Sequence, residues 1–454
     1  MTAVRVKEDR PHPAGAVALL ATRRFGPLFW AQFLSAFNDN AVKNALVLLI
    51  TYRAAAGSQL SAQLLVPLAG GLFILPFFLC SATAGQFADQ NDKAWLIRLI
   101  KSTEIVLMLV AAAGVIAGST IVLLAVLTVM GIEAAFFGPL KYAILPDLLA
   151  PHELMLGNAL VEGGTFIAIL LGTIAGVLIA GRHGAILVAV LIIVVALAAW
   201  GTSLMIPPTP AAAPASRVGW NLLAATWRVI GEAAGETVPF RSMLGISWFW
   251  LAGAVYLSQF PSYVRFTLDG GEVVVTLFLT VFSIGIALGS LACSRLLGGR
   301  ISARTVPWGA LGIGLFSIDL WLASPVPTTD GAALAGLAGF LAQPAHWRVL
   351  GDLLGISVCG GIFIVPLYVL LQAASRREHR ARAIAANNVI NAAAMVVAAL
   401  ATIALIGAGL SVSALFLLTG GATLAVALWC WRILPSLTLP PTALPPNALD
   451  REDR

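Results

Sequence analysis

Apolar stretches of about twenty residues recur along the chain from Phe29 to Trp431, with short polar segments between them. Each stretch is long enough to cross a hydrocarbon core of about 30 Å as a helix. The stretches lack the strict alternation of apolar and polar residues that marks a membrane β-barrel strand. Because only helices and closed barrels satisfy their backbone hydrogen bonds in lipid, the pattern predicts membrane-spanning helices.

Twelve spans are predicted, covering residues 28–53, 62–88, 95–118, 121–147, 154–180, 184–206, 243–267, 273–296, 305–323, 350–372, 382–407 and 411–434. The longest polar connection follows the sixth span. It contains the stretch WNLLAATWRVIGEA, which has the pattern of an amphipathic helix on the membrane surface. The predicted fold is an all-α membrane protein with two six-helix bundles, at 28–206 and 243–434, a cytoplasmic linker at 207–242, and cytoplasmic tails at 1–27 and 435–454.

Composition and charge support this organisation. Hydrophobic residues make up 59% of the 454 residues and charged residues only 11%, whereas a soluble domain carries about 25% charged residues. With the N-terminus in the cytoplasm, 21 of the 27 Lys and Arg residues fall in cytoplasmic segments or adjacent span ends. This asymmetry fixes the predicted orientation. It also assigns the net charge of +6 to contact with membrane lipids rather than nucleic acid.

The two halves of the chain echo each other. The segment FFGPLKYAILPDLL around Pro139 resembles IFIVPLYVLLQAAS around Pro366, 227 residues later. Six spans, a long loop and six more spans resemble the architecture of the major facilitator superfamily. In that architecture the substrate path lies between two bundles, which rock to alternate access.

Charged side chains inside a span are costly, so they usually face a cavity or a partner. Span one carries Asp39 and Lys43 four residues apart on one helical face, close enough to pair, with Asn40 and Asn44 on the adjacent stripe. We interpret these residues as a site that binds a zwitterion or gates the path. The alternative is an internal pair that holds helices together.

Spans four and five carry further candidates. Glu133 and Lys141 lie in span four, and Lys141 either meets a phosphate in the cavity or pairs with Asp147 or Glu162. Asn158 and Glu162 share one face of span five, where Glu162 is a candidate partner for Lys141 or for a substrate amine. Both spans are therefore predicted to contribute to the substrate site.

Span seven is rich in aromatic residues. Tyr256 and Gln259, with Pro261, are candidates to line a broken helix on the substrate path. The alternative is that the aromatic residues form an interface belt and pack against neighbouring helices.

The connection between spans two and three reads GQFADQNDKAWLIR. It resembles the signature loop of the facilitator superfamily, which latches helix ends on the cytoplasmic side. That resemblance implies a conformational role, and no substrate contact, for the residues Gly85, Asp89, Lys93 and Arg98.

Several motifs are absent from the sequence. It contains no G-x-x-x-x-G-K-[ST] phosphate loop, no G-x-S-x-G nucleophile motif, and no His/Cys cluster with metal-ligand spacing. We therefore predict a protein that is not an enzyme and needs no metal or cofactor.

The strings AQFLSAFNDNAVKNALVLL, GPLKYAILPDLL, LGNALVEGGTFIA and SWFWLAGAVYLSQFP resemble the bacterial lysophospholipid transporter family, in particular the branch often fused to an acyltransferase and an acyl-ligase. The resemblance implies a protein of the bacterial inner membrane that flips lysophosphatidylethanolamine-like lipids from the outer to the inner leaflet by alternating access. It carries the family's aspartate-asparagine pair onto Asp39 and Asn40, and the span-four lysine onto Lys141. Some members have an arginine in span seven where this chain has Leu257, so Lys43 is expected to substitute for it.

The chain ends after the twelfth predicted span, so the resemblance also implies a separate cytoplasmic acyltransferase or acyl-ligase partner. Two other functions compete with lysolipid transport. One is a facilitator-type exporter of amphipathic drugs or small solutes. The other is a membrane scaffold that recruits an acyltransferase, but a scaffold gains little from charge buried at Asp39 and Lys43.

Overall fold

The computed structural model describes the backbone of residues 15–55, 59–182, 184–214, 218–219, 221–325 and 334–433, and the side chains of these residues except those at 48–67 and 178–182. The predicted tail at 435–454 and the first fourteen residues of the predicted tail at 1–27 lie outside the described residues.

The described chain is almost entirely helical. Its long helices are α2 (Gly26–Ala55), α3 (Gln59–Gln90), α4 (Lys93–Ala117), α5 (Thr120–Ala143), α7 (Leu154–Arg182), α8 (Ala185–Ser203), α10 (Thr237–Phe266), α11 (Glu272–Leu297), α12 (Val306–Ala323), α14 (Pro344–Ala374), α15 (Arg380–Gly407) and α16 (Val412–Ile433). Shorter helices are α1 (Ala16–Leu20), α6 (Leu145–Leu148), α9 (Leu222–Ala234), α13 (Leu337–Leu341) and the 3-10 turn η1 (Arg377–His379).

Eleven of the described helices are long and apolar enough to cross a membrane. The remaining long helix is α2, which carries Asp39, Lys43 and three asparagines in its described part. The all-α membrane fold is thereby confirmed, and the count of twelve spans stays a prediction.

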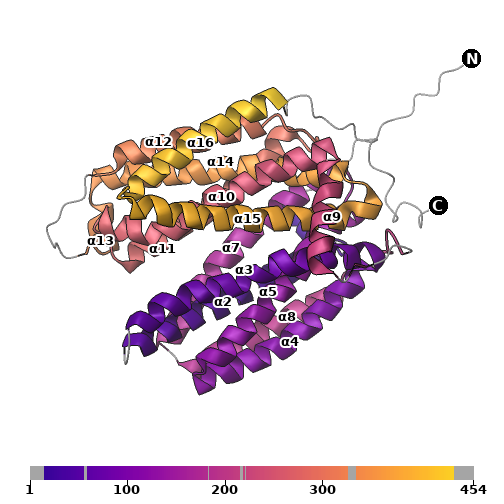
Figure 1. Cartoon of the computed structure of the whole chain (residues 1–454), viewed down its shortest axis with the longest axis horizontal. Coiled ribbons are helices and arrows are strands. Elements are labelled where there is room, and N and C mark those ends of the chain that lie inside the picture. The colour runs from indigo at the N-terminus through magenta and orange to yellow at the C-terminus, as the bar shows by residue number, and fades with distance from the viewer. Residues whose placement is uncertain are drawn as a thin grey trace, which may run out of the picture.

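The long helices form two bundles, one from α2 to α8 and the other from α10 to α16 (Figure 1). The bundles touch mainly where α7 packs on α11 and where α3 packs on α15. They come together at the end where α9 crosses (Figure 1). We call this end, which contains Gly85, Asp147 and Arg382, the closed end, and the opposite end, which contains Gly70 and Met395, the open end.

The predicted amphipathic segment forms α9. Its first turn is capped by Asn221, whose side-chain oxygen accepts a hydrogen bond of 3.1 Å from the Ala224 amide. Ala225, Val229 and Ala233 are buried, whereas Leu223 and Trp227 are exposed. The predicted linker is shorter than 207–242, because α10 already begins at Thr237.

Close packing of α2 on α7 sets the direction of the charged side chains of α2. A Cβ on Gly172 would lie 2.2 Å from the Phe37 carbonyl oxygen, and one on Gly176 would lie 2.5 Å from the Ala41 carbonyl oxygen. At about 100° per residue, Asp39 points about 200° away from both contacts. Because Gly172 and Gly176 have no side chain, one face of α2 packs directly against α7. Asp39 lies on the opposite face of α2, which faces the other bundle.

Replacing Gly172 by alanine is expected to lower the thermal midpoint of the detergent-purified protein, because the added methyl group overlaps a backbone carbonyl that a packed helix cannot move cheaply. A thermal unfolding scan monitored by size-exclusion chromatography measures the shift. Gly201→Ala in α8 is the matched control, since a Cβ there meets no atom within 4 Å. Equal midpoints for the two variants would contradict the packing argument.

Candidate functional site

A cavity of about 370 Å³ lies between the two bundles. In the first bundle it is lined by α2, α3, α4, α5 and α7, and in the second by α10, α14 and α15. Among the described residues, the charged lining comes entirely from the first bundle and consists of Asp39, Lys43, Lys101, Glu133 and Lys141. The second bundle adds aromatic, amide and apolar groups: Trp250, Tyr368, Asn388, Asn391, Ala392 and Met395.

Three of the five charged groups have no ion-pair partner within 4.0 Å in the described part of the chain, namely Asp39, Lys43 and Lys141. The pair expected between Asp39 and Lys43 is therefore not formed in this conformation. The Lys43 ammonium lies 5.7 Å from the centre of the Phe73 ring, and the Lys141 ammonium 4.9 Å from that of Tyr142. These charged groups remain available to a ligand in the cavity.

The other two charged groups belong to a buried cluster around Lys101. The Lys101 ammonium lies 2.7 Å from a Glu104 carboxylate oxygen and 3.3 Å from one of Glu133, and it also donates to the Ser35 hydroxyl. Ser35 in turn donates to Glu104 at 2.8 Å, and the ammonium lies 4.1 Å from the centre of the Phe137 ring. The cluster ties α2, α4 and α5 together within the cavity wall.

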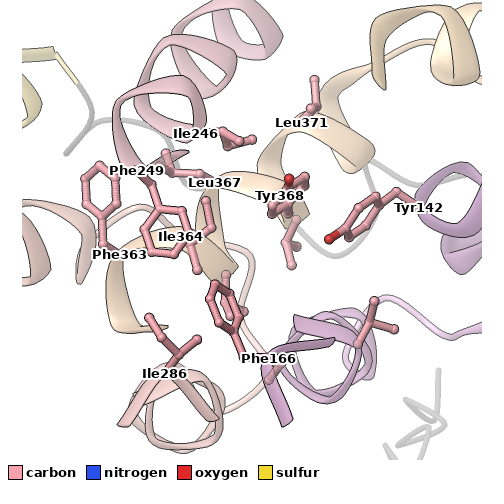
Figure 2. Close-up of a cluster of buried hydrophobic side chains, with 14 of the residues drawn as sticks. Tyr142, Phe166, Ile246, Phe249, Ile286, Phe363, Ile364, Leu367, Tyr368 and Leu371 are labelled. Carbon is pink, nitrogen blue, oxygen red and sulfur yellow. The ribbon is translucent and has the colours of Figure 1, made fainter. Parts of the chain in front are cut away.

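Aromatic rings close the cavity at the junction of the two bundles. Tyr142 of α5 stacks on Tyr368 of α14, with ring centres 4.3 Å apart and planes 8° from parallel. The Trp250 indole nitrogen donates a hydrogen bond of 3.2 Å to the Tyr368 hydroxyl. Figure 2 shows these two tyrosines facing each other beside the apolar core formed by Phe166, Phe249 and Ile286. We call the stacked pair the tyrosine floor.

Beyond the tyrosine floor, α3 meets α15 at the closed end. The Asp89 carboxylate accepts hydrogen bonds from the backbone amides of Ala381 and Arg382, at 3.0 and 3.3 Å, and from the Arg382 guanidinium at 3.2 Å. A Cβ on Gly85 would lie 2.6 Å from the Ala385 Cβ. An acceptor at the N-terminus of α15 and a glycine one turn away thus allow the two helices to touch.

Asp147 forms a second contact between the bundles at the closed end. Its carboxylate lies 2.9 Å from the Lys93 ammonium of the first bundle, and 3.6 and 3.7 Å from the guanidinium groups of Arg380 and Arg377 in the second. Arg98 donates a hydrogen bond of 2.6 Å to the carbonyl oxygen of Ile206. All four residues of the predicted signature loop therefore lie at the closed end, and their conformational role stays a prediction.

Comparison with known proteins agrees with this architecture. A model of the Major Facilitator Superfamily matches residues 28–355. The protein named lysophospholipid transporter LplT of Escherichia coli is 30% identical over 419 residues, which cover 88% of this chain and 94% of that protein. Its namesake from Serratia proteamaculans is 30% identical over 361 residues, covering 78% and 81%. The chain belongs to the lysophospholipid transporter family of the major facilitator superfamily.

The fold of this facilitator is also that of a solved human structure. The crystal structure of the human organic anion transporter MFSD10 (TETRAN) aligns with a TM-score of 0.69 at 15% sequence identity, covering 89% of this chain and 98% of that one. Identity at that level concerns the fold alone. In the described part of the chain, no group of three His, Cys, Asp or Glu side chains is placed to hold a metal ion.

Four predicted site residues of the facilitator lie behind the cavity wall. The side-chain amide of Asn40 donates to the Ala36 carbonyl, and that of Asn44 donates to the Asn40 carbonyl and the Thr173 hydroxyl. Asn158 exchanges two hydrogen bonds with Gln372 of the second bundle, at 2.9 and 2.7 Å. Glu162 accepts a hydrogen bond of 2.6 Å from the Tyr142 hydroxyl. These residues hold helices in place around the cavity but do not line it.

The predicted contribution of Tyr256 and Gln259 differs from the structure. Tyr256 is buried inside the second bundle, where its hydroxyl lies 2.5 Å from that of Ser317, and the Gln259 side chain bonds to Ser258. Neither residue lines the cavity, and α10 continues through Pro261 without a break. The aromatic residue of α10 that reaches the cavity is Trp250, because it lies on a different face of the helix from Tyr256.

Sequence reasoning also missed Lys101 and Tyr368 as cavity residues of this facilitator. The internal repeat held a signal for Tyr368, because aligning Pro139 with Pro366 places Tyr368 at the position of Lys141. The repeat therefore brings two equivalent positions, one cationic and one aromatic, to the same cavity.

Proposed function

We propose that this facilitator moves lysophospholipids with a phosphoethanolamine-like headgroup from the outer to the inner leaflet of the bacterial inner membrane by alternating access. The cavity takes the headgroup, and the closed end faces the cytoplasm. The structure then represents the conformation that receives substrate from the outer side. A separate cytoplasmic acyltransferase or acyl-ligase would consume the lipid delivered to the inner leaflet.

The observation that carries this proposal is the set of unpaired charges on one wall of the cavity. Lys43 and Lys141 offer two ammonium groups to a phosphate, and Asp39 offers a carboxylate to a substrate amine. Charge-assisted hydrogen bonds of this kind are about twice as strong as neutral ones. A zwitterion satisfies both signs at once, which an uncharged sugar or a simple cation does not.

The open half of the cavity suits an acyl chain. Phe73, Ile74 and Phe77 of α3 and Ala392 and Met395 of α15 give it an apolar lining. A Cβ on Gly70 would meet no atom within 4 Å, so no neighbouring helix covers this face of α3. A single chain, which spans about half of a 30 Å hydrocarbon core, can therefore extend from the cavity between α3 and α15.

The distribution of basic residues supports the orientation. The closed end carries Arg376, Arg377, Arg380 and Arg382 on the segment that leads into α15. In the described part of the chain, few basic residues lie at the open end, where Arg265 and Arg348 are found. Because Lys and Arg are enriched on the cytoplasmic side of membrane proteins, the closed end is the cytoplasmic one in this proposal.

The test is a leaflet assay with the purified protein in proteoliposomes. Labelled lysophosphatidylethanolamine is added outside, and the fraction that albumin cannot extract reports movement to the inner leaflet. Lys141→Ala is expected to slow this movement by about 10- to 100-fold, since a hydrogen bond to a charged group contributes about 1.5–3 kcal/mol. Asp39→Asn is expected to slow it for the amine-bearing lipid.

Arg265→Ala is the matched control, because it removes a cation at the open end that lies outside the cavity. Its rate should equal that of the unmodified protein. An unmodified protein that moves no lysolipid, but exports hydrophobic cations, would replace this proposal with the exporter function. Full activity in both Lys141→Ala and Asp39→Asn would remove these residues from the mechanism.

A further inference from the structure

One cavity side chain of the second bundle, Asn388, has both of its hydrogen-bonding groups free in the described part of the chain. Its polar neighbours in the cavity wall are already engaged. Trp250 donates its indole hydrogen to Tyr368, and Asn391 accepts a hydrogen bond of 2.7 Å from Ser247. The Asn388 side chain is partly exposed, so its amide can meet a ligand in the cavity.

A close approach of α15 to α5 sets the position of the Asn388 amide. A Cβ on Gly138 of α5 would lie 2.7 Å from the Asn388 side-chain nitrogen, so the glycine provides the space in which the amide lies. Lys141 follows Gly138 by three residues, a spacing that makes the two residues neighbours on the surface of α5. Both line the cavity. The amide therefore lies about one helical turn from the ammonium group proposed to bind phosphate.

The cavity presents its groups in a fixed order between its two ends. Helix α5 runs toward the closed end, so Lys141 lies nearer that end than Gly138 and the amide beside it. Helix α15 runs the other way. On the same face of α15, Asn388 is followed by Ala392 and Met395, which line the open half of the cavity. The order from the closed end to the open end is a cation, an amide and an apolar wall.

A lysophospholipid carries matching groups in the same order. Its phosphate is attached at one end of the glycerol, the free hydroxyl is on the next carbon, and the acyl chain leaves from the other end. A hydroxyl both donates and accepts a hydrogen bond, and so does a primary amide. In a diacyl phospholipid that oxygen is esterified, so it has no hydrogen to donate and carries a second chain.

We propose that the Asn388 side chain binds the free glycerol hydroxyl of the lysolipid and thereby selects lysophospholipids over diacyl phospholipids. The inference rests on the proposed function, because Lys141 has to hold the phosphate for the hydroxyl to lie beside Asn388. A diacyl phospholipid leaves the amide oxygen unpaired, and its second chain needs the space that the amide occupies beside Gly138. Sites that hydrogen-bond a substrate hydroxyl discriminate strongly against analogues that lack it, for the same reason.

The test compares two single-chain lipids in the leaflet assay with the purified full chain. They are lysophosphatidylethanolamine and its 2-deoxy analogue, which has the same headgroup and chain but lacks the hydroxyl. Size therefore does not account for a difference between them. At subsaturating concentration, the unmodified protein is expected to move the hydroxyl-bearing lipid about 3- to 10-fold faster, the effect of one hydrogen bond. Protein-free vesicles give the background rate for each lipid.

Asn388→Leu is expected to move the two lipids at equal rates, because leucine has no hydrogen-bonding group. Gly138→Ala should give the same result by a different route. Its methyl group takes the space of the amide, which is the end of a flexible side chain and can turn away without unfolding the protein. A merely structural effect would lower both rates and leave their ratio unchanged. The thermal midpoint in size-exclusion chromatography checks that each variant is folded.

Asn391→Leu is the matched control, one turn further along α15. The Asn391 oxygen already accepts the Ser247 hydrogen bond, so this amide serves its own bundle. Whatever its absolute rate, Asn391→Leu should therefore retain the preference for the hydroxyl-bearing lipid.

Equal rates for the two lipids in the unmodified protein would overturn the assignment of Asn388 and leave the proposed function standing. A preference that survives in Asn388→Leu would do the same. If the unmodified protein moves neither lipid above the background, the proposed function fails, and this inference fails with it.

Discussion

Replacing Lys101 by methionine is expected to destabilise the protein by about 3–5 kcal/mol, a large part of the 5–15 kcal/mol by which a typical fold is stable. The Lys101 side chain is only 1% exposed, and its ammonium group contacts Glu104, Glu133 and Ser35. Without it, the carboxylates of Glu104 and Glu133 remain in the cavity wall with no cation to offset their desolvation. Little folded protein should survive detergent extraction, which the monodisperse yield and the thermal midpoint in size-exclusion chromatography measure.

The control for this prediction is a variant in which the two glutamates are neutralised together with Lys101. Combining Lys101→Met with Glu104→Gln and Glu133→Gln removes the unpaired charges together with their partner, so most of the lost stability should return. A Lys101→Met variant that is as stable as the unmodified protein would show that the ammonium does not hold the cluster together. The compensated protein would then reveal, in the leaflet assay, whether the Glu133 charge also serves the substrate.

Replacing Gly85 by leucine is expected to abolish net lysolipid movement while leaving a folded protein. At this position a Cβ would already lie within 3 Å of Ala385, the Ala381 carbonyl and the Arg382 Cα. A leucine therefore keeps α3 and α15 apart and prevents the closed end from forming. The variant should remain open on that side and should not complete the cycle.

Spin labels at Trp95→Cys and Glu378→Cys, in a background without the four native cysteines, measure this separation. Both positions are exposed near the closed end, one on each bundle. The distance between the labels should increase in Gly85→Leu and should not change in Gly71→Leu. The second variant is on the same helix, but a Cβ at Gly71 meets no atom within 4 Å. Full activity of Gly85→Leu would show that tight contact at Gly85 is not required.

Sequence reasoning predicted the cavity residues best where a charged side chain would be most unfavourable in contact with lipid. Asp39, Lys43 and Lys141 were expected to face a protected passage because lipid-facing charge is so unfavourable, and all three line the cavity. Glu162 was assigned to the same site, yet it does not line the cavity and accepts a hydrogen bond from Tyr142 of the tyrosine floor. Helical periodicity shows which face of a helix a residue occupies. It does not show whether a side chain of another helix, such as the Tyr142 ring, lies between that residue and the cavity.

Contacts between segments that are distant in the chain could not be predicted from the sequence. The pairing of Lys101 with Glu104, three residues away, follows from helical spacing and is present. The same ammonium also binds Glu133 of another helix, and no local pattern shows this. Likewise, the aromatic content of span seven did not distinguish Trp250 from Tyr256. That helix packs against neighbours on several sides, and composition does not reveal which side adjoins the cavity.

The unequal division of charge between the bundles separates two tasks, the binding of the headgroup and the movement of the bundles past each other. Every charged cavity residue described here belongs to the first bundle, whereas the second bundle offers rings, amides and aliphatic groups. A bound headgroup would therefore stay attached to the first bundle throughout the transport cycle. The second bundle would move relative to the headgroup without breaking a charged contact to it. Headgroup preference and cycling speed then become independently adjustable, the former through the first half of the gene and the latter through the second.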